Sequence, residues 1–253
     1  MDGRPRILLT NDDGVRAVGL VALAEALNAV GEVVVVAPAV EQSGTSHGLT
    51  LRRPLKIEKL AERWHAVHAT PADCVNVAFF HLLDRRPDLV VSGVNNGFNL
   101  GDDILYSGTV GAALEGRILG APSMAVSTEF DAGREVLENA ARVAARLAVR
   151  VLERGLPADS ILNVNVPAAP RGFRVTRQGR RLLREGLLRR REGDTLEFEW
   201  IGLPPTEWVE NPHADHTAIA EGLVSLTPLH SDLTFHRSLP DLEAWDLPAG
   251  DAR

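Results

Sequence analysis

Two adjacent carboxylates near the N-terminus are the residues of this sequence best suited to chemistry. Asp12 and Asp13 stand between the apolar run Ile7–Leu9 and a segment, Gly19–Val30, whose apolar residues recur at helical spacing. We therefore expect the pair in the turn that leaves a buried strand, at the edge where open α/β sheets bind ligands. Two carboxylates repel a bare phosphate, whereas Mg²⁺ and Mn²⁺ prefer such oxygen ligands. A divalent cation is one interpretation; a solvated turn, or Asp13 capping the following helix, is the other.

A second candidate segment carries glycines and hydroxyls at the start of a predicted helix. The run Tyr106–Gly111 leads into apolar residues at helical spacing. The backbone N–H groups at a helix N-terminus can hold an anion, so Ser107, Gly108 and Thr109 are predicted to bind a phosphate. No lysine follows the glycines, which excludes a P-loop.

The elements that must position these residues indicate an α/β fold. The continuous β-branched run Val33–Val36 is typical of a strand buried on both faces of a parallel sheet. Thr70 is predicted to cap a helix that has Pro71 at its first position, and residues 134–154 form the clearest amphipathic helix, ended by Gly155. Further strands are predicted at residues 49–59, 88–92, 121–127, 161–166 and 221–229. We expect a three-layer α/β/α, Rossmann-like, mostly parallel sheet, with polar loops at residues 39–48 and 93–103.

The chain changes character after about residue 170. Residues 173–177 and 196–201 alternate as strands do, and residues 171–191 hold nine arginines and one acid, Glu185. We expect a single domain over residues 1–253, with a core of about 1–170 and a strand-rich C-terminal arm and tail of about 171–253. The arginines could form a nucleic-acid patch. That role is disfavoured because stacking aromatics are scarce there and the chain carries a net charge of −7. An arm that pairs with a second subunit is favoured, because an isolated two-stranded ribbon is marginally stable in water.

Composition narrows the class of protein further. The 253 residues are 45% hydrophobic and 24% charged, as in ordinary globular proteins. The single cysteine, Cys74, excludes an internal disulfide and is expected in the core. The start of the sequence is polar, and no segment reaches the roughly 18 apolar residues of a membrane span. These features predict a cytoplasmic protein. The pairs His65/His68 and His213/His216 lack the helical spacing and neighbouring glutamate of a zinc site.

Three separated stretches resemble one family. They are residues 7–14 (ILLTNDDG), residues 41–47 (EQSGTSH) and residues 92–111, from Ser92-Gly93-Val94-Asn95 to Gly101-Asp102-Asp103-Ile104-Leu105-Tyr106-Ser107-Gly108-Thr109-Val110-Gly111. Residues 70–76 and 224–229 resemble the same family, the survival protein E (SurE) nucleotidases, in the same order along the chain.

The resemblance implies one divalent cation per subunit, Mg²⁺ or Mn²⁺, held by Asp12, Asp13, Ser43 and Asn95. It also implies a homodimer or homotetramer. Two positions depart from the family pattern. Ala39-Val40 replaces the usual Asp-Arg, and Asn96 stands where the family often has a basic or small residue. Both changes bear on substrate preference more than on the cation.

The expected function is hydrolysis of nucleoside 5′-monophosphates, with 3′-monophosphates and short polyphosphate as further candidate substrates. Asp12 and Asn96 are the catalytic candidates, Asn96 through contact with the transferring phosphoryl group. A haloacid-dehalogenase-type phosphatase is disfavoured because it needs an Asp-x-Asp spacing and a lysine near the site, and Lys56 and Lys59 are the only lysines. A nucleotide sensor that uses the same pocket without catalysis is the main alternative.

Overall fold

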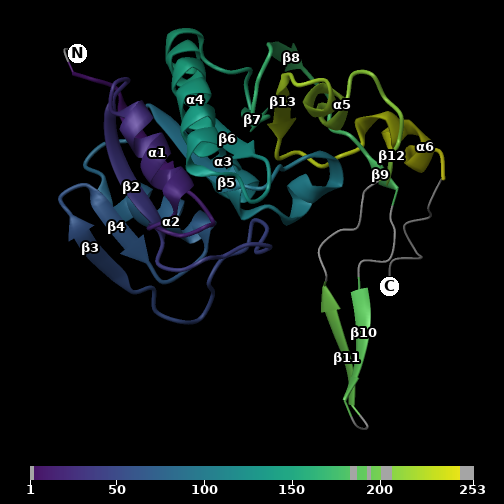
Figure 1. Cartoon of the computed structure of the whole chain (residues 1–253), viewed down its shortest axis with the longest axis horizontal. Coiled ribbons are helices and arrows are strands. Elements are labelled where there is room, and N and C mark those ends of the chain that lie inside the picture. Colours follow the sequence, from purple (N-terminus) through teal and green to yellow (C-terminus); the bar gives the residue numbers. More distant parts are fainter. Residues whose placement is uncertain (1–2, 183–186, 193–194, 201–206, 246–253) are drawn as a thin grey trace.

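The protein is built on one nine-stranded sheet with helices on both faces (Figure 1). The computed structural model describes residues 3–182, 187–192, 195–200 and 207–245. The strands of the sheet are, in chain order, β1 (Arg6–Thr10), β2 (Glu32–Pro38), β3 (Ile57–Ala61), β4 (Trp64–Val67), β5 (Leu89–Asn96), β6 (Ser123–Thr128), β7 (Ser160–Val166), β8 (Phe173–Val175) and β13 (Val224–His230). Their order across the sheet is β3-β4-β2-β1-β5-β6-β7-β13-β8.

The helices and the short strands complete the chain. The α-helices are α1 (Val18–Leu27), α2 (Pro71–Val77), α3 (Gly108–Ile118), α4 (Arg134–Arg154), α5 (Asp215–Ala220) and α6 (Leu239–Glu243). Single turns of other helix types are η1 (Ala78–Leu82, π), η2 (Gly101–Tyr106, 3₁₀) and η3 (His236–Ser238, 3₁₀). Two antiparallel pairs lie outside the sheet, β9 (Arg181–Leu182) with β12 (Glu207–Trp208), and β10 (Leu187–Glu192) with β11 (Thr195–Trp200).

The centre of the sheet is parallel, as the sequence predicts. Strands β4, β2, β1, β5, β6 and β7 all run in one direction, while β3 and β13 run antiparallel to β4 and β7. The carboxyl ends of the central strands therefore meet at one edge. The loops that carry the predicted site residues leave the sheet at this edge.

Alternate residues of each central strand enter two separate cores. Ile7 and Leu9 of β1 pack with α1 and α4, while Leu8 packs with α2 and α3 on the other face. The run Val33–Val36 divides in the same way between the two cores. Cys74 is fully buried on the α2 side, as expected for a core residue. The three-layer prediction is confirmed.

Two strand predictions differ most from the structure in their bounds. The strand predicted over residues 49–59 begins only at Ile57. The N–H of Thr50 donates instead to the Asp73 carboxylate, at 3.0 Å from Oδ2, so this segment is bound to the start of α2 rather than to the sheet. In the other case β5 continues past Ser92 to Asn96, with an irregular register against β6 between Ser92 and Asn95. Asn95 and Asn96 are therefore strand-end residues, not loop residues.

The C-terminal third of the chain contains helical structure that the sequence did not predict. Helix α5 is only six residues long, too short for a periodic pattern. The β10–β11 hairpin extends away from the body in Figure 1, and it includes the predicted strand up to Trp200, with Ile201 outside the described residues. Within the described part of the chain, no helix is long and apolar enough to cross a membrane.

The C-terminal elements hold η2, the segment that leads into the predicted phosphate loop. The fully buried Asp215 carboxylate of α5 accepts the N–H of Gly101 at 2.9 Å and that of Gly179 at 3.0 Å. Asp102 accepts the N–H of Arg181 at 2.7 Å, and the Arg181 guanidinium pairs with Asp103. Residues more than 70 positions apart thus fix where η2 lies.

Replacing Asp215 by alanine is predicted to destabilise the fold, because it leaves the buried N–H groups of Gly101 and Gly179 without an acceptor. The expected loss in free energy of unfolding is about 2–4 kcal/mol, measured by urea denaturation. Asp241→Ala, at an exposed position of α6, is the matched control and should change stability little. Equal effects of the two substitutions would contradict this role for Asp215.

Candidate metal and phosphate site

Asp12 lies against the N-terminus of α3. Its carboxylate accepts the Thr109 N–H at 3.1 Å and a short hydrogen bond from the Thr109 hydroxyl. Asp12 is 4% exposed, so the turn after β1 buries a carboxylate directly beneath the predicted phosphate loop. The two candidate segments of the sequence therefore form one site.

Gly108 lies tightly against Asp12, so that even a methyl side chain would be crowded at this contact. A Cβ atom on Gly108 would lie 3.0 Å from the Asp12 Cβ and 3.1 Å from its Oδ2. Ser107 caps the helix, its hydroxyl accepting the Val110 N–H at 3.1 Å. In the described part of the chain, the Gly108 N–H forms no hydrogen bond, so it remains available to an anion.

Asp13 faces the end of β5. Its carboxylate accepts the backbone N–H of Asn96 at 3.2 Å. The side-chain amide of the neighbouring Asn95 donates to the Gly97 carbonyl at 2.6 Å, which leaves the Asn95 carbonyl oxygen as the atom free to bind a cation. The Asn96 side chain contacts the next loop, its oxygen accepting the N–H of Ala132 at 2.9 Å.

The paired carboxylates are electrostatically unfavourable as they stand. Burial raises the pKa of Asp12 above its ordinary value, against the opposing effect of the Thr109 hydrogen bonds. Burial, and then the charge of Asp12, raises the pKa of Asp13 to about 6. Glu41 adds further negative charge near both. Among the described residues, neither aspartate has a basic side chain as its partner, so a bound cation would supply the missing charge.

The loop after β2 reaches the same site. The N–H of Gln42 donates to the Asp12 carbonyl at 2.7 Å, which brings Ser43 beside the aspartate turn. The Ser43 hydroxyl itself donates to Glu41 at 2.9 Å and is exposed. To bind a cation together with Asp12 and Asp13, this hydroxyl would have to leave Glu41.

The loop is anchored along its length by contacts that the sequence did not predict. The N–H of Ser46 donates to the Tyr106 carbonyl at 3.1 Å. His47 pairs with Glu115 of α3 at 2.6 Å, and Glu115 also accepts from Asn76 of α2 at 2.7 Å. The three separated stretches therefore contact one another, through Gln42 with Asp12, Ser46 with Tyr106 and Thr109 with Asp12. The contacts of Glu115 with His47 and Asn76 also hold the loop against α3.

The donor set fits a hard divalent cation. Asp12, Asp13, Ser43 and Asn95 offer oxygen atoms only, and all four lie on adjacent strand ends or the loops that follow them. A phosphate at the Gly108 N–H would also lie beside the Asp12 carboxylate, an arrangement that a cation between them would make favourable. Ligation by each residue stays a prediction.

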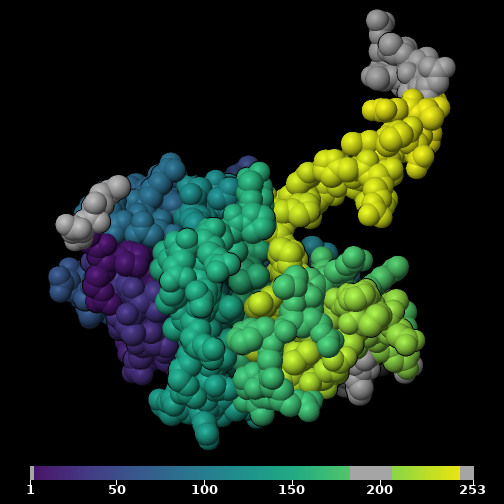
Figure 2. Space-filling model, turned by 90° about the horizontal axis from the view of Figure 1, so that it is seen from above, coloured from purple at the N-terminus to yellow at the C-terminus, as the bar shows by residue number. Residues whose placement is uncertain are grey.

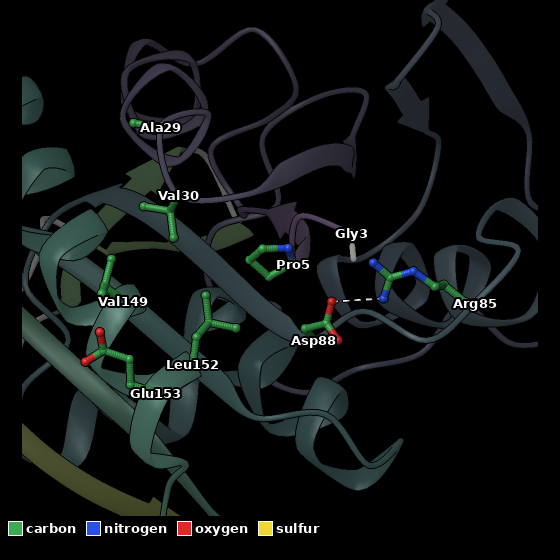
Figure 3. Close-up of a pocket in the computed structure, with 9 residues that line it drawn as sticks. All are labelled: Gly3, Pro5, Ala29, Val30, Arg85, Asp88, Val149, Leu152 and Glu153. Atoms are coloured by element: carbon green, nitrogen blue, oxygen red, sulfur yellow. Dashed lines mark hydrogen bonds and ion pairs between the residues drawn. The ribbon is translucent and has the colours of Figure 1, made fainter. Parts of the chain in front are cut away.

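Two cavities lie at opposite edges of the sheet. One, of about 260 Å³, adjoins the candidate site and is lined by Asp13, Ala17, Val18, Gly19, Asn96, Ala132, Arg134 and Leu137. The other, of about 800 Å³, lies near the amino ends of β1 and β5. Figure 3 shows its apolar side chains and the ion pair between Arg85 and Asp88. Although it is larger, the second cavity contains none of the predicted site residues, and parallel α/β sheets bind ligands at the carboxyl edge.

One histidine of each pair has a structural partner. His68 contacts Glu58 at 3.0 Å, and the ring of His216 stacks on Trp208 with centroids 4.4 Å apart. Within the described residues, no cluster of three or more His, Cys, Asp or Glu side chains could hold a metal ion, so a cation at Asp12 and Asp13 must draw on neutral ligands. Several arginines of the basic segment are also engaged: Arg171 and Arg174 with Glu221, and Arg181 with Asp103.

Comparison with known proteins identifies the family. The model of the family described as survival protein SurE matches residues 7–185. The chain belongs to the SurE family. The crystal structure of the SurE protein from Aquifex aeolicus is similar over 96% of this chain and 100% of its own, with a TM-score of 0.86 and 41% identity.

Curated SurE relatives are similar over nearly their whole length. The 5′-nucleotidase SurE of Geotalea daltonii is 46% identical over 246 residues, covering 96% of this chain and 99% of its own. That of Methylococcus capsulatus is 47% identical over 243 residues, covering 94% and 96%. The SurE match spans both the turn at Asp12 and the helix at Thr109, the two parts of the site.

The raised pKa of Asp13 predicts a pH-dependent stability of the metal-free protein. The folded state binds the proton of the Asp13 carboxyl group more tightly than the unfolded chain does. Protonation of Asp13 therefore stabilises the fold at low pH, and this stabilisation is lost as the pH rises through about 6. In chelator at about pH 7, Asp13→Asn should therefore melt at a higher temperature than the wild type, and the gap should close towards about pH 4.

Added Mn²⁺ should reverse that order, since it stabilises the wild type and binds deprotonated ligands. Thermal melting at several pH values, with and without Mn²⁺, checks both statements. If the metal-free wild type is more stable than Asp13→Asn at about pH 7, the charge of Asp13 does not destabilise the metal-free fold and this interpretation is wrong.

Proposed function

We propose that this SurE-family protein is a 5′-nucleotidase that hydrolyses nucleoside 5′-monophosphates with one Mg²⁺ or Mn²⁺ per subunit. The observation that carries the proposal is the contact of the Asp12 carboxylate with the N-terminus of α3. This contact places a carboxylate that can bind a cation next to the backbone N–H groups that can bind a phosphate. Hydrolysis of a phosphate ester needs both groups together. The relatives from Geotalea and Methylococcus carry the name 5′-nucleotidase.

Each residue then has a role that suits its contacts. Asp12, Asp13, Ser43 and Asn95 would hold the cation, which supplies charge neutralisation and activates water. The Gly108 N–H donates to a phosphate oxygen, while Ser107 and Thr109 fix the helix end that presents it. The Asn96 amide contacts the transferring phosphoryl group from the end of the neighbouring strand, β5.

Substrate range extends the proposal. We propose 3′-monophosphates and short polyphosphate as further substrates. The residues described above contact the phosphate, whereas the leaving group would contact other parts of the surface. The alternative is a sensor that binds nucleotides in the same pocket and releases no phosphate. The single buried cysteine suits a reducing compartment, and we propose the cytoplasm.

Phosphate release from a panel of monophosphates with Mg²⁺ or Mn²⁺ tests this function. Chelation should silence the wild type and added metal should restore it. Asp12→Asn is nearly isosteric, and it removes one of the two negative charges that bind the cation. Turnover should therefore fall about 100-fold or more. Glu25→Gln on α1 is an exposed control and should keep full activity. Metal-restored phosphate release rules out the sensor, and full activity of Asp12→Asn would refute the mechanism.

The protein is also proposed to self-associate. The segment after β13 exposes large apolar side chains and has no buried residue in η3 or α6; these side chains are Leu233, Phe235, Leu239, Leu242 and Trp245. Figure 2 shows this C-terminal segment extending from the body. A second subunit would cover it, in addition to the β10–β11 arm, giving a homodimer or homotetramer.

Light scattering at micromolar concentration is expected to report at least a dimer. The double substitution Phe235→Ser and Leu242→Ser should shift the population towards smaller species, because it removes apolar area that the partner buries. Phe80→Ser, an exposed substitution on η1, is the control. A wild-type monomer at that concentration would refute the proposal.

A further inference from the structure

Phe130 is an aromatic side chain exposed beside the candidate site. It lies in the loop between β6 and α4, and 85% of its surface is accessible. Exposed apolar residues are common on proteins and are uninformative singly. The position of Phe130 is informative, because the loop begins at the carboxyl edge of the sheet, where the catalytic residues are.

The loop is tied to the site at two points. Thr128, the last residue of β6, is the register partner of Asn96 in β5. The N–H of Ala132 donates to the Asn96 side chain at 2.9 Å. Phe130 lies between these two residues in sequence, so its backbone is held close to the strand end that carries Asn95 and Asn96.

The Phe130 ring approaches Asn95 across a glycine. A Cβ atom on Gly97 would lie 3.7 Å from the Asn95 Nδ2 and 3.9 Å from a ring carbon of Phe130. Gly97 thus separates a predicted cation ligand from the aromatic ring with no side chain between them. The cavity of about 260 Å³ reaches from Asp13 to Ala132 and Arg134, so open space also connects this loop with the aspartate turn.

The chemistry of the loop selects the kind of group that could lie there. Glu129 and Asp131 flank Phe130, and their charges disfavour a second phosphate. A flat, neutral, aromatic group is suited to the ring face, and nucleobases stack on such faces regardless of their identity. The cavity is smaller than a typical site for a whole ligand, so it would admit only part of one.

We propose that Phe130 is a base-stacking residue, and that the β6–α4 loop forms the nucleoside subsite of this enzyme. The inference rests on the proposed function, since it places the base of the substrate whose phosphate binds at Gly108. Stacking without hydrogen bonds to the base edge gives affinity for nucleotides over sugar phosphates and little discrimination among bases. Phe130 therefore determines substrate class.

Binding of adenosine, followed by NMR titration, tests the subsite independently of phosphate release. Phe130→Ala should weaken adenosine binding by roughly 5- to 100-fold, the range found for loss of one stacking aromatic, and Phe130→Trp should restore it. Phe80→Ala, an exposed phenylalanine on the other face of the sheet, is the matched control and should bind as the wild type does.

Steady-state kinetics supply the second readout. Phe130→Ala should raise KM for adenosine 5′-monophosphate by a similar factor, with kcat/KM for ribose 5-phosphate unchanged within about twofold. If the wild type binds adenosine through Phe130 and releases no phosphate from any nucleotide, the proposed function fails and the subsite stands.

Three results would overturn the subsite. They are equal adenosine affinity in Phe130→Ala and the wild type, no adenosine binding by the wild type, or a loss that follows Tyr106→Ala instead. Tyr106 is an exposed aromatic side chain that directly precedes Ser107 of the phosphate loop, and it is the competing stacking surface.

Discussion

The contact between Asp12 and the first turn of α3 is the interaction on which the site depends. It places a buried carboxylate against backbone N–H groups that could otherwise face an anion. The hydrogen bonds from Thr109 favour the charged form of Asp12 and only partly offset the cost of burial. In the proposed mechanism a cation held by Asp12, Asp13, Ser43 and Asn95 would supply the positive charge that this arrangement lacks.

The rest of the fold keeps this contact in place. The parallel strands bring the ends of β1, β2 and β5 to one edge, so that residues about 30 and 80 positions apart can share a ligand. The His47–Glu115–Asn76 network holds the loop after β2 against α3. Asp215 and Arg181 hold η2 from the C-terminal side, which makes the late part of the chain a support for the phosphate loop.

The sequence predicts those features that local patterns encode. Helix α4 has the predicted bounds because its apolar stripe is long and Gly155 takes a positive φ of 72° at its end, which glycine adopts readily. Thr70 caps α2 as expected, through a reciprocal hydrogen-bond pair with Asp73. The aspartate turn after β1 also follows from a short apolar strand and the helix beyond it.

Contacts between distant residues were not predictable in the same way. Thr109 was predicted to bind phosphate, whereas in the structure both its N–H and its hydroxyl donate to Asp12, 97 positions away. Residues 49–56 alternate like a strand, but this segment is hydrogen-bonded to the capping box of α2 instead. The Thr50 N–H donates to Asp73, and the Thr70 hydroxyl donates to the Gly48 carbonyl. Helix α5 is too short for periodicity, and the burial of Asp215 depends on glycines from two other segments. No pattern in one sequence records these pairings.

The position of Mn²⁺ in crystals of the protein, found from its anomalous scattering, tests the central claim most directly. The account predicts one strong peak per subunit, within bonding distance of the carboxylates of Asp12 and Asp13 and beside the N-terminus of α3. Crystals of Asp12→Asn grown in the same way should show a much weaker peak there. A strong Mn²⁺ peak elsewhere with none between Asp12 and Asp13, or an undiminished peak in Asp12→Asn, would contradict it.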